Sequence, residues 1–132
     1  FVEYLAATRS FLSKGRRNLI IYPEGTRSTS GKMASFKRGP AVVAVELGFP
    51  IIPAGIEGSH KCWPKGRALI RPGSVRVCIG DPVYPDAAAL EASAGSQSAP
   101  FGEYKRLIAE VEARVNDLCG KTPAEPVDCV AG

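Results

Sequence analysis

The chain of 132 residues contains one histidine, and its four cysteines include no Cys-x-x-Cys pair. A structural zinc site needs several such ligands at short spacings, so no metal site is predicted. There is no run of 18 apolar residues, and the sequence therefore predicts no membrane-spanning helix. Glycine-rich nucleotide loops are also missing, and no organic cofactor is expected. The sequence has no helix-turn-helix or zinc-finger pattern, which argues against a nucleic-acid partner.

Acidic residues are scarce in the first part of the chain. Residues 1–80 hold 13 Lys/Arg and 4 Asp/Glu, a net charge of +9, whereas residues 81–132 hold 4 and 9, a net charge of −5. The basic part favours an anionic ligand or an anionic membrane surface as its partner. The chain begins Phe1-Val2-Glu3, inside an expected helix, and we interpret it as a fragment.

Hydrophobic periodicity and the turn residues predict alternating helices and strands. Helices are expected over residues 2–14, 41–47, 86–93 and 103–118. Strands are expected over residues 18–22, 49–56, 67–71 and 74–80. Residues 57–66 are expected to form a loop in which Trp63, beside Lys61 and Lys65, covers the core, stacks on a ligand or sits at a membrane interface.

A turn after the first expected strand is the strongest candidate site. Pro23 ends the apolar run 18–22, and Gly25 allows a tight turn or a close approach to a ligand. Open α/β proteins place ligand sites at such strand ends. An arginine beside hydroxyl groups suits a phosphate, although a surface loop with a solvated arginine remains an alternative. The polar residues that follow the turn are Thr26, Arg27 and Ser28.

Three segments in order resemble the glycerolipid acyltransferases of the 1-acylglycerol-3-phosphate acyltransferase type. Residues 22–28, Tyr-Pro-Glu-Gly-Thr-Arg-Ser, resemble the family's Phe-Pro-Glu-Gly-Thr-Arg-Ser block. Residues 35–39 match its Phe-Lys-x-Gly segment, and residues 49–56 match its Val-Pro-Ile-Val-Pro-Val block. The resemblance implies an α/β fold with a central mixed sheet flanked by helices, of which this chain is an incomplete acyltransferase domain.

The resemblance also implies which residues bind the acceptor. Arg27 would make the main ionic contact with the acceptor phosphate, and Glu24 would brace the loop, because a free carboxylate repels phosphate. The complete acceptor-phosphate block is Glu24, Gly25, Thr26 and Arg27, with the Gly25 backbone as a further donor. Lys37 and Arg38 would be supporting basic residues, or else solvated charges. The apolar wall of the site would be Pro50, Ile51, Ile52 and Pro53, with plain core as the alternative for the two isoleucines.

The implied reaction moves a fatty acyl group from acyl-CoA or acyl-carrier protein to a hydroxyl of a lysophosphatidate-like glycerolipid, at the cytoplasmic face of a membrane. In the family, the base is the histidine of His-x-x-x-x-Asp. This chain has no histidine before His60, and Pro64 stands where the aspartate would follow it. The catalytic residues are therefore expected upstream, and the fragment alone is expected to be inactive. The alternative is a non-catalytic module that binds phospholipid or anionic membrane.

The expected domain organisation follows from these elements. Residues 1–93 are expected to form the acyltransferase portion, and residues 94–100, rich in serine, glycine and alanine, a linker. A C-terminal helix over 101–119 and a disordered tail over 120–132 complete the prediction.

Overall fold

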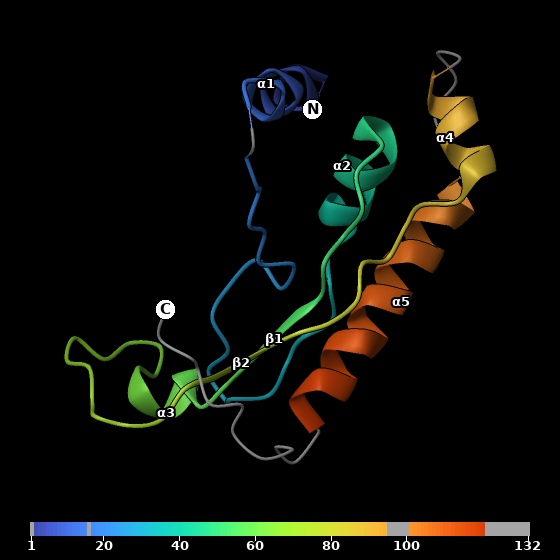
Figure 1. Ribbon diagram of the computed structural model, residues 1–132. Coiled ribbons are helices and arrows are strands. Elements are labelled where there is room, and N and C mark those ends of the chain that lie inside the picture. Colours follow the sequence, from blue (N-terminus) through green and yellow to red (C-terminus); the bar gives the residue numbers. More distant parts are fainter. Residues whose placement is uncertain (1, 16, 95–100, 121–132) are drawn as a thin grey trace, which may run out of the picture.

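The computed structural model describes residues 2–15, 17–94 and 101–120, and Figure 1 shows their arrangement. The elements follow in the order α1 (Val2–Ser13), α2 (Gly39–Leu47), β1 (Ala54–Glu57), α3 (Ser59–Cys62), β2 (Arg76–Ile79), α4 (Ala87–Ala94) and α5 (Phe101–Gly120). The predicted α/β class is confirmed. No helix among the described residues is long and apolar enough to cross a membrane.

The sheet consists of β1 and β2, which pair antiparallel with Gly55 opposite Cys78. One face of the sheet packs on the end of α5, where a β-carbon added to Gly55 would stand 2.9 Å from Cys119 Sγ. The opposite face is apolar but exposed, and includes Ile56 and Val77. Within the described residues, the sheet is therefore a two-stranded antiparallel ribbon rather than the expected mixed sheet.

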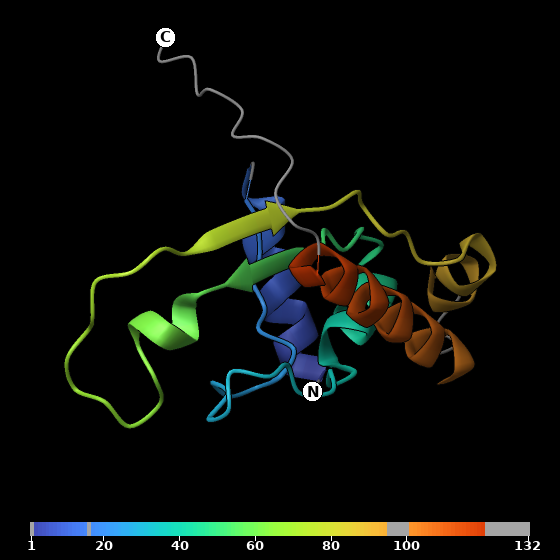
Figure 2. The same ribbon diagram turned by 90° about the horizontal axis from the view of Figure 1, so that it is seen from below.

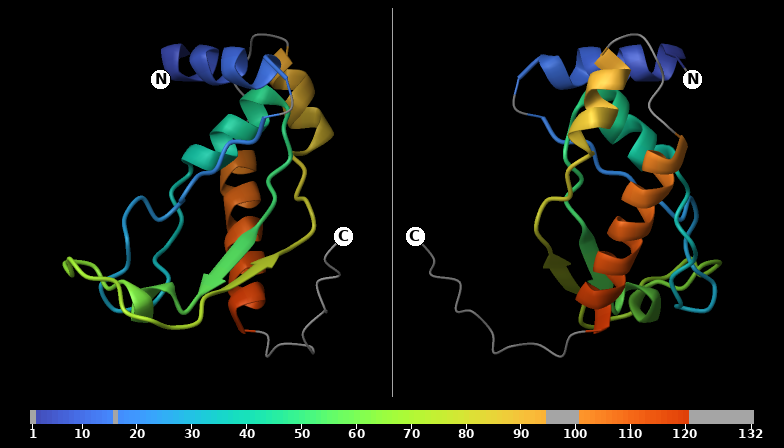
Figure 3. Two further views of the ribbon diagram at one scale, coloured as in Figure 1. Left: turned by 60° about the vertical axis from the view of Figure 1, so that its left-hand side comes forward. Right: turned by 90° about the vertical axis from the view of Figure 1, so that its right-hand side faces the viewer.

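The core forms where α5 packs on α2 and on the sheet (Figure 3). The buried residues of α5 form one apolar stripe, because residues three and four apart share one helix face. Leu107, at the centre of the stripe, is completely buried. The other buried residues of α5 are Tyr104, Ile108, Val111 and Val115. They meet the small side chains of α2, of which Ala41, Ala44 and Val45 belong to the same core cluster.

A proline and a glycine set the start and the end of α2. Pro40 lies in the first turn, where its missing N–H is not needed. Gly48 ends the helix with a φ of 72°. The N–H of Phe49 donates to Ala44 O at 2.9 Å, while that of Gly48 donates to Val45 O at 3.4 Å. This pair of bonds is a Schellman ending, which fixes where the chain leaves the helix.

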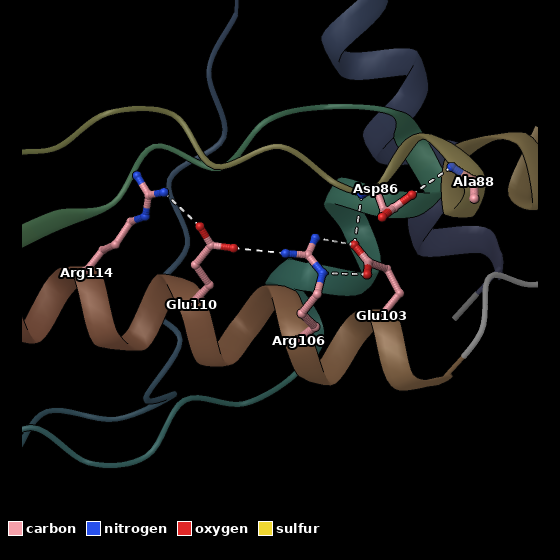
Figure 4. Close-up of polar contacts among 6 residues, drawn as sticks. All are labelled: Asp86, Ala88, Glu103, Arg106, Glu110 and Arg114. Atoms are coloured by element: carbon pink, nitrogen blue, oxygen red, sulfur yellow. Dashed lines mark hydrogen bonds and ion pairs between the residues drawn. The ribbon is translucent and has the colours of Figure 1, made fainter.

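Polar contacts join α4 to α5 (Figure 4). Asp86 caps α4, since its Oδ1 accepts the N–H of Ala88 at 2.9 Å. The N–H of Asp86 donates to Glu103 Oε1 on α5, also at 2.9 Å. The Arg106 guanidinium donates to both Glu103 oxygens and holds the pKa of that carboxyl below its usual value. Ion pairs continue along α5 through Glu110 to Arg114.

Two expected strands are wrong. Residues 18–22 are extended but pair with no strand in the described part of the chain, and the Ile20 side chain is 77% exposed. Residues 67–71 form a loop, in which Leu69 is 82% exposed. An apolar run specifies a tendency to extend, but a strand also needs a neighbour to accept its backbone hydrogen bonds. Arg76, by contrast, lies in β2, where it pairs with Glu57.

Smaller differences concern element boundaries. The predicted strand over 49–56 begins only at Ala54, after Pro53, with one isolated bridge between Ile51 and Val83. The predicted loop over 57–66 contains the short helix α3. Apart from their first residues, the expected linker (94–100) and tail (120–132) lie outside the described residues. The helix predicted over 101–119 is confirmed, and it packs on α2 and β1.

Candidate functional site

The candidate site is built on a β-turn over residues 22–25. The N–H of Gly25 donates to Tyr22 O at 3.0 Å, with Pro23 at the second position of the turn. Proline suits that position because its φ is already fixed near the required value. Gly25 has a φ of 72°, which a residue with a β-carbon rarely adopts. The Gly25 N–H is thus used inside the turn, and the expectation that it donates to a ligand is wrong for this structure.

Glu24 points away from the turn and into the loop that follows. Its Oε2 accepts the N–H of Ala34 at 2.7 Å, across ten residues of the chain. This contact is the bracing that a carboxylate beside a phosphate site was expected to provide. Glu24 is the only acidic residue between Arg17 and Glu46. The segment therefore supplies no second carboxylate to the positive charges around the turn.

Lys37 lies directly over the turn. Its backbone N–H donates to Pro23 O at 2.9 Å, which ties the two segments together. Its ammonium covers Gly25 so closely that an added β-carbon would stand 2.6 Å from Nζ. The structure thus brings Lys37 to the expected acceptor block, as the family resemblance implied.

Arg38, by contrast, is directed elsewhere. It occupies the N-cap position of α2, and its guanidinium lies over the ring of Phe101, 4.6 Å from the centroid. A cation over an aromatic face is attracted by the electron-rich ring. Although Lys37 and Arg38 are adjacent in sequence, the Lys37 side chain lies at the turn and the Arg38 side chain lies on Phe101.

Residues from the region of α3 complete the surroundings of the turn. Arg27 lies over the ring of Trp63, 4.7 Å from the centroid. Lys65 Nζ donates to Thr26 Oγ1 at 2.9 Å. Figure 2 shows α3 and the loop after it extending from the end of β1 away from α5. No local pattern in the sequence predicts these contacts, because the partners are 36 and 39 residues apart.

The four residues expected to form the apolar wall have different environments. Ile51 and Val83 exchange two backbone bonds of 2.9 and 2.8 Å, and Pro53 is fully buried with its carbonyl bonded to Gly80. Ile52 is 57% exposed on the other side of this segment, and Pro50 is exposed as well. Ile51 and Pro53 therefore stabilise the fold, which agrees with the plain-core alternative for Ile51.

His60 lies in α3 and packs against the loop after the turn. A β-carbon added at Gly31 would stand 2.9 Å from His60 Cδ2. No ion pair or hydrogen bond to a carboxylate orients the ring among the described residues. The described part of the chain also holds no group of three His, Cys, Asp or Glu side chains that could bind a metal ion.

The arrangement as a whole suits a phosphate monoester. The Lys37 ammonium lies at Gly25, the Lys65 ammonium bonds to Thr26, and Arg27 follows in sequence with its guanidinium over Trp63. Thr26 adds a hydroxyl, while the nearest carboxylate is engaged with a backbone N–H. Converging cations with hydroxyl donors recognise oxyanions through charge-assisted hydrogen bonds.

Comparison with known proteins agrees with this site chemistry. The Acyltransferase family model matches residues 2–57, which include the turn and Lys37. A 1-acyl-sn-glycerol-3-phosphate acyltransferase of Cocos nucifera is 33% identical over 85 residues, 64% of this chain. The enzyme of that name from Pseudomonas aeruginosa is 32% identical over 107 residues, 81% of this chain.

A solved structure is also similar. The 1-acyl-sn-glycerophosphate acyltransferase PlsC from Thermotoga maritima superposes with a TM-score of 0.65 at 31% identity and covers 91% of this chain. The proteins that this chain resembles are therefore all acyltransferases. More narrowly, its relatives are 1-acyl-sn-glycerol-3-phosphate acyltransferases. The matches cover 28% of the Cocos protein, 35% of the Pseudomonas protein and 46% of the PlsC chain, so this chain spans less than half of each.

Proposed function

We propose that the protein containing this chain transfers a fatty acyl group from a thioester donor to the free hydroxyl of a lysophosphatidate-like glycerolipid. The observation that carries the proposal is the positive charge gathered at the turn: the Lys37 ammonium lies at Gly25, the Lys65 ammonium bonds to Thr26, and Arg27 is the next residue. A phosphate monoester is the part of such an acceptor that this charge would recognise. The names of the similar proteins support the same acceptor class.

In the proposed reaction the acceptor hydroxyl attacks the thioester carbonyl. A C–O bond forms, the C–S bond breaks, and the thiol leaves with the proton that the hydroxyl gave up. This chain holds the acceptor phosphate through the edges of the Arg27 guanidinium, the Thr26 hydroxyl and the Lys37 ammonium. Holding the phosphate fixes the distance from the hydroxyl to the donor, which is a large part of the rate advantage in such transfers.

The general base is proposed to come from another part of the protein. His60 is the one histidine of this sequence, and it packs against Gly31 rather than beside an orienting carboxylate. The His-x-x-x-x-Asp pair that the family resemblance implies would supply the base and its orienting group. We propose acyl-CoA or acyl-carrier protein as the donor, and a membrane surface at its cytoplasmic face as the place of reaction.

The proposal is tested by incubating the full-length protein with labelled oleoyl-CoA and lysophosphatidate and separating the lipids. The expected product is phosphatidate, formed with release of one free thiol for each acyl group. Oleoyl-acyl-carrier protein in place of oleoyl-CoA identifies the donor. Monoacylglycerol, which lacks the phosphate, is the matched acceptor and should react far more slowly. Absence of transfer to any acceptor would contradict the proposal.

A non-catalytic lipid-binding module is the second candidate. The +9 charge of residues 1–80 favours it, because such a charge attracts anionic lipid without any reaction. Binding of the full-length protein to lysophosphatidate vesicles with no transfer from either donor would support this candidate over the enzyme.

A further inference from the structure

The segment from Gly58 to Gly73, here called the 58–73 loop, folds back on itself and contacts Thr26, the residue after the turn 22–25. The N–H of Arg71 donates to Cys62 O at 2.8 Å, which closes the base of the loop. Trp63 Nε1 donates to Arg67 O, also at 2.8 Å. These contacts fix the side of the loop that carries Trp63 and Lys65, so the loop presents both side chains from a defined framework.

The same loop is close-packed where it begins. Gly58 has a φ of 82°, and a β-carbon there would stand 2.2 Å from Ser74 O. The backbone at Ser74 thus leaves no room for a side chain at Gly58. Between Glu57 and Asp81 the sequence has no acidic residue, and Glu57 itself pairs with Arg76. The positive charge of the loop is therefore not neutralised from within.

The contact between Lys65 and Thr26 leaves hydrogen-bonding capacity on both residues. A lysine ammonium has three N–H donors, and Lys65 gives one of them to Thr26 Oγ1. Two donors remain for an anion. Because the Thr26 oxygen accepts this bond, its own O–H is free to donate to the same anion.

The contact between Trp63 and Arg27 has a similar consequence. The guanidinium carbon of Arg27 lies 4.7 Å from the centroid of the Trp63 ring, and a π face takes up none of the hydrogen-bond acceptors of the site. The contact therefore holds Arg27 beside Trp63 while N–H donors remain for an anion. The 58–73 loop positions Arg27 through Trp63 and adds a second cation through Lys65.

We infer that Lys65 is a direct ligand of the acceptor's phosphate monoester, together with Arg27 and Lys37. In the structure Lys65 occupies the supporting place that the sequence assigned to Arg38, which stacks on Phe101 instead. The inference rests on the proposed function, because it assigns a further residue to the same acceptor site. It also makes the 58–73 loop part of acceptor recognition, beyond the matched family segment of residues 2–57.

The test compares Lys65→Gln with Lys61→Gln in the full-length protein. Lys61 is an exposed lysine of the same loop whose side chain makes no polar contact with the turn in the described part of the chain. Lys65→Gln should raise the KM for lysophosphatidate by roughly 10-fold or more, the usual cost of a lost charged hydrogen bond. The KM for oleoyl-CoA should not change. Lys61→Gln should alter either KM by less than about two-fold.

Two further arms separate possible explanations. Lys65→Arg keeps the charge and should restore most of the affinity for lysophosphatidate. Competition by glycerol 3-phosphate and by inorganic phosphate distinguishes a lipid headgroup from free phosphate. If the phosphate itself is the group recognised, both compounds should inhibit Lys65→Gln less than the wild-type protein. If the site recognises a lipid headgroup, glycerol 3-phosphate should inhibit more strongly than inorganic phosphate. Equal kinetics for the two glutamine variants, or a change confined to oleoyl-CoA, would overturn the inference.

Failure of the proposed function is recognised separately. If the wild-type protein forms no phosphatidate from either donor, the proposed reaction is wrong, and Lys65 is then tested by flotation with phosphatidylcholine vesicles that contain lysophosphatidate. Weaker binding of Lys65→Gln than of Lys61→Gln would keep Lys65 as a phosphate ligand. Equal binding of both variants would remove it from the site.

Discussion

Replacing Gly25 with alanine separates the positioning of Lys37 from the stability of the fold. The new β-carbon would stand 2.6 Å from Lys37 Nζ and 3.0 Å from its Cε. The end of a lysine side chain can move, so the overlap is relieved by displacing the ammonium from the turn. The backbone strain remains, because a residue with a β-carbon at this φ costs about 1–2 kcal/mol. Gly25→Ala should therefore lose that much stability together with one cationic contact to the acceptor.

Gly48 provides the matched control. It has the same φ of 72°, at the end of α2, and a β-carbon there would meet no atom within 4 Å. Gly48→Ala should show a similar loss of about 1–2 kcal/mol in urea denaturation. Only Gly25→Ala should also lose about 1.5–3 kcal/mol of transition-state stabilisation, the usual contribution of a charged hydrogen bond. This loss corresponds to a fall of roughly 10- to 150-fold in kcat/KM for lysophosphatidate. Equal kcat/KM in the two variants would refute the placement of Lys37 at the acceptor.

Three predictions concern stability. Gly58→Ala should cost at least about 2 kcal/mol in urea denaturation, because its β-carbon would meet the Ser74 carbonyl oxygen at 2.2 Å and backbone cannot move aside cheaply; a loss below about 1 kcal/mol would refute the close approach. Leu107→Ala should cost about 2–5 kcal/mol, since it empties the centre of the core, and a smaller loss in the same assay would place Leu107 outside it. Glu103→Gln should lower stability at pH 7 by about 0.5–1 kcal/mol. Because Arg106 lowers the pKa of Glu103 below 4.5, the wild-type advantage is present above that pH and should fade as the pH drops through the lowered pKa; an advantage that stays constant down to pH 2 would contradict this origin.

The helices could be predicted because their signals are local. Pro40 and Gly48 delimit α2, and the stripe through Leu107 defines the buried face of α5. Each signal depends on residues within one or two turns of helix, where backbone geometry fixes which side chains share a face. The Asp86 cap was predictable for the same reason.

The strands were predicted less well because pairing is not local. Residues 18–22 are more apolar than residues 74–80, yet only Arg76–Ile79 within the second range forms a strand, opposite Ala54–Glu57. Whether an extended segment joins a sheet depends on which backbone lies beside it. Neither the composition of a segment nor its alternation of apolar and polar residues specifies which segment lies beside it.

In the candidate site too, features that depend on local sequence could be predicted, and features that depend on distant residues could not. The turn at Gly25 and the bracing by Glu24 followed from turn chemistry and from the repulsion between a carboxylate and a phosphate. The different positions of the Lys37 and Arg38 side chains, and the contact of Lys65 with Thr26, depend on tertiary packing. These side chains are set by where α2, α5 and α3 lie, which residue types alone do not specify.

The acceptor-phosphate assignment is tested most directly by Arg27→Ala with two acceptors. In the full-length protein, kcat/KM for lysophosphatidate should fall by about 2–4 kcal/mol of transition-state stabilisation, the cost of removing a charged partner. The same variant should leave kcat/KM for monoacylglycerol, which has no phosphate, nearly unchanged. A loss confined to the phosphate-bearing acceptor would support the account. An equal loss with both acceptors, or no loss with either, would contradict the claim that this turn holds the acceptor phosphate.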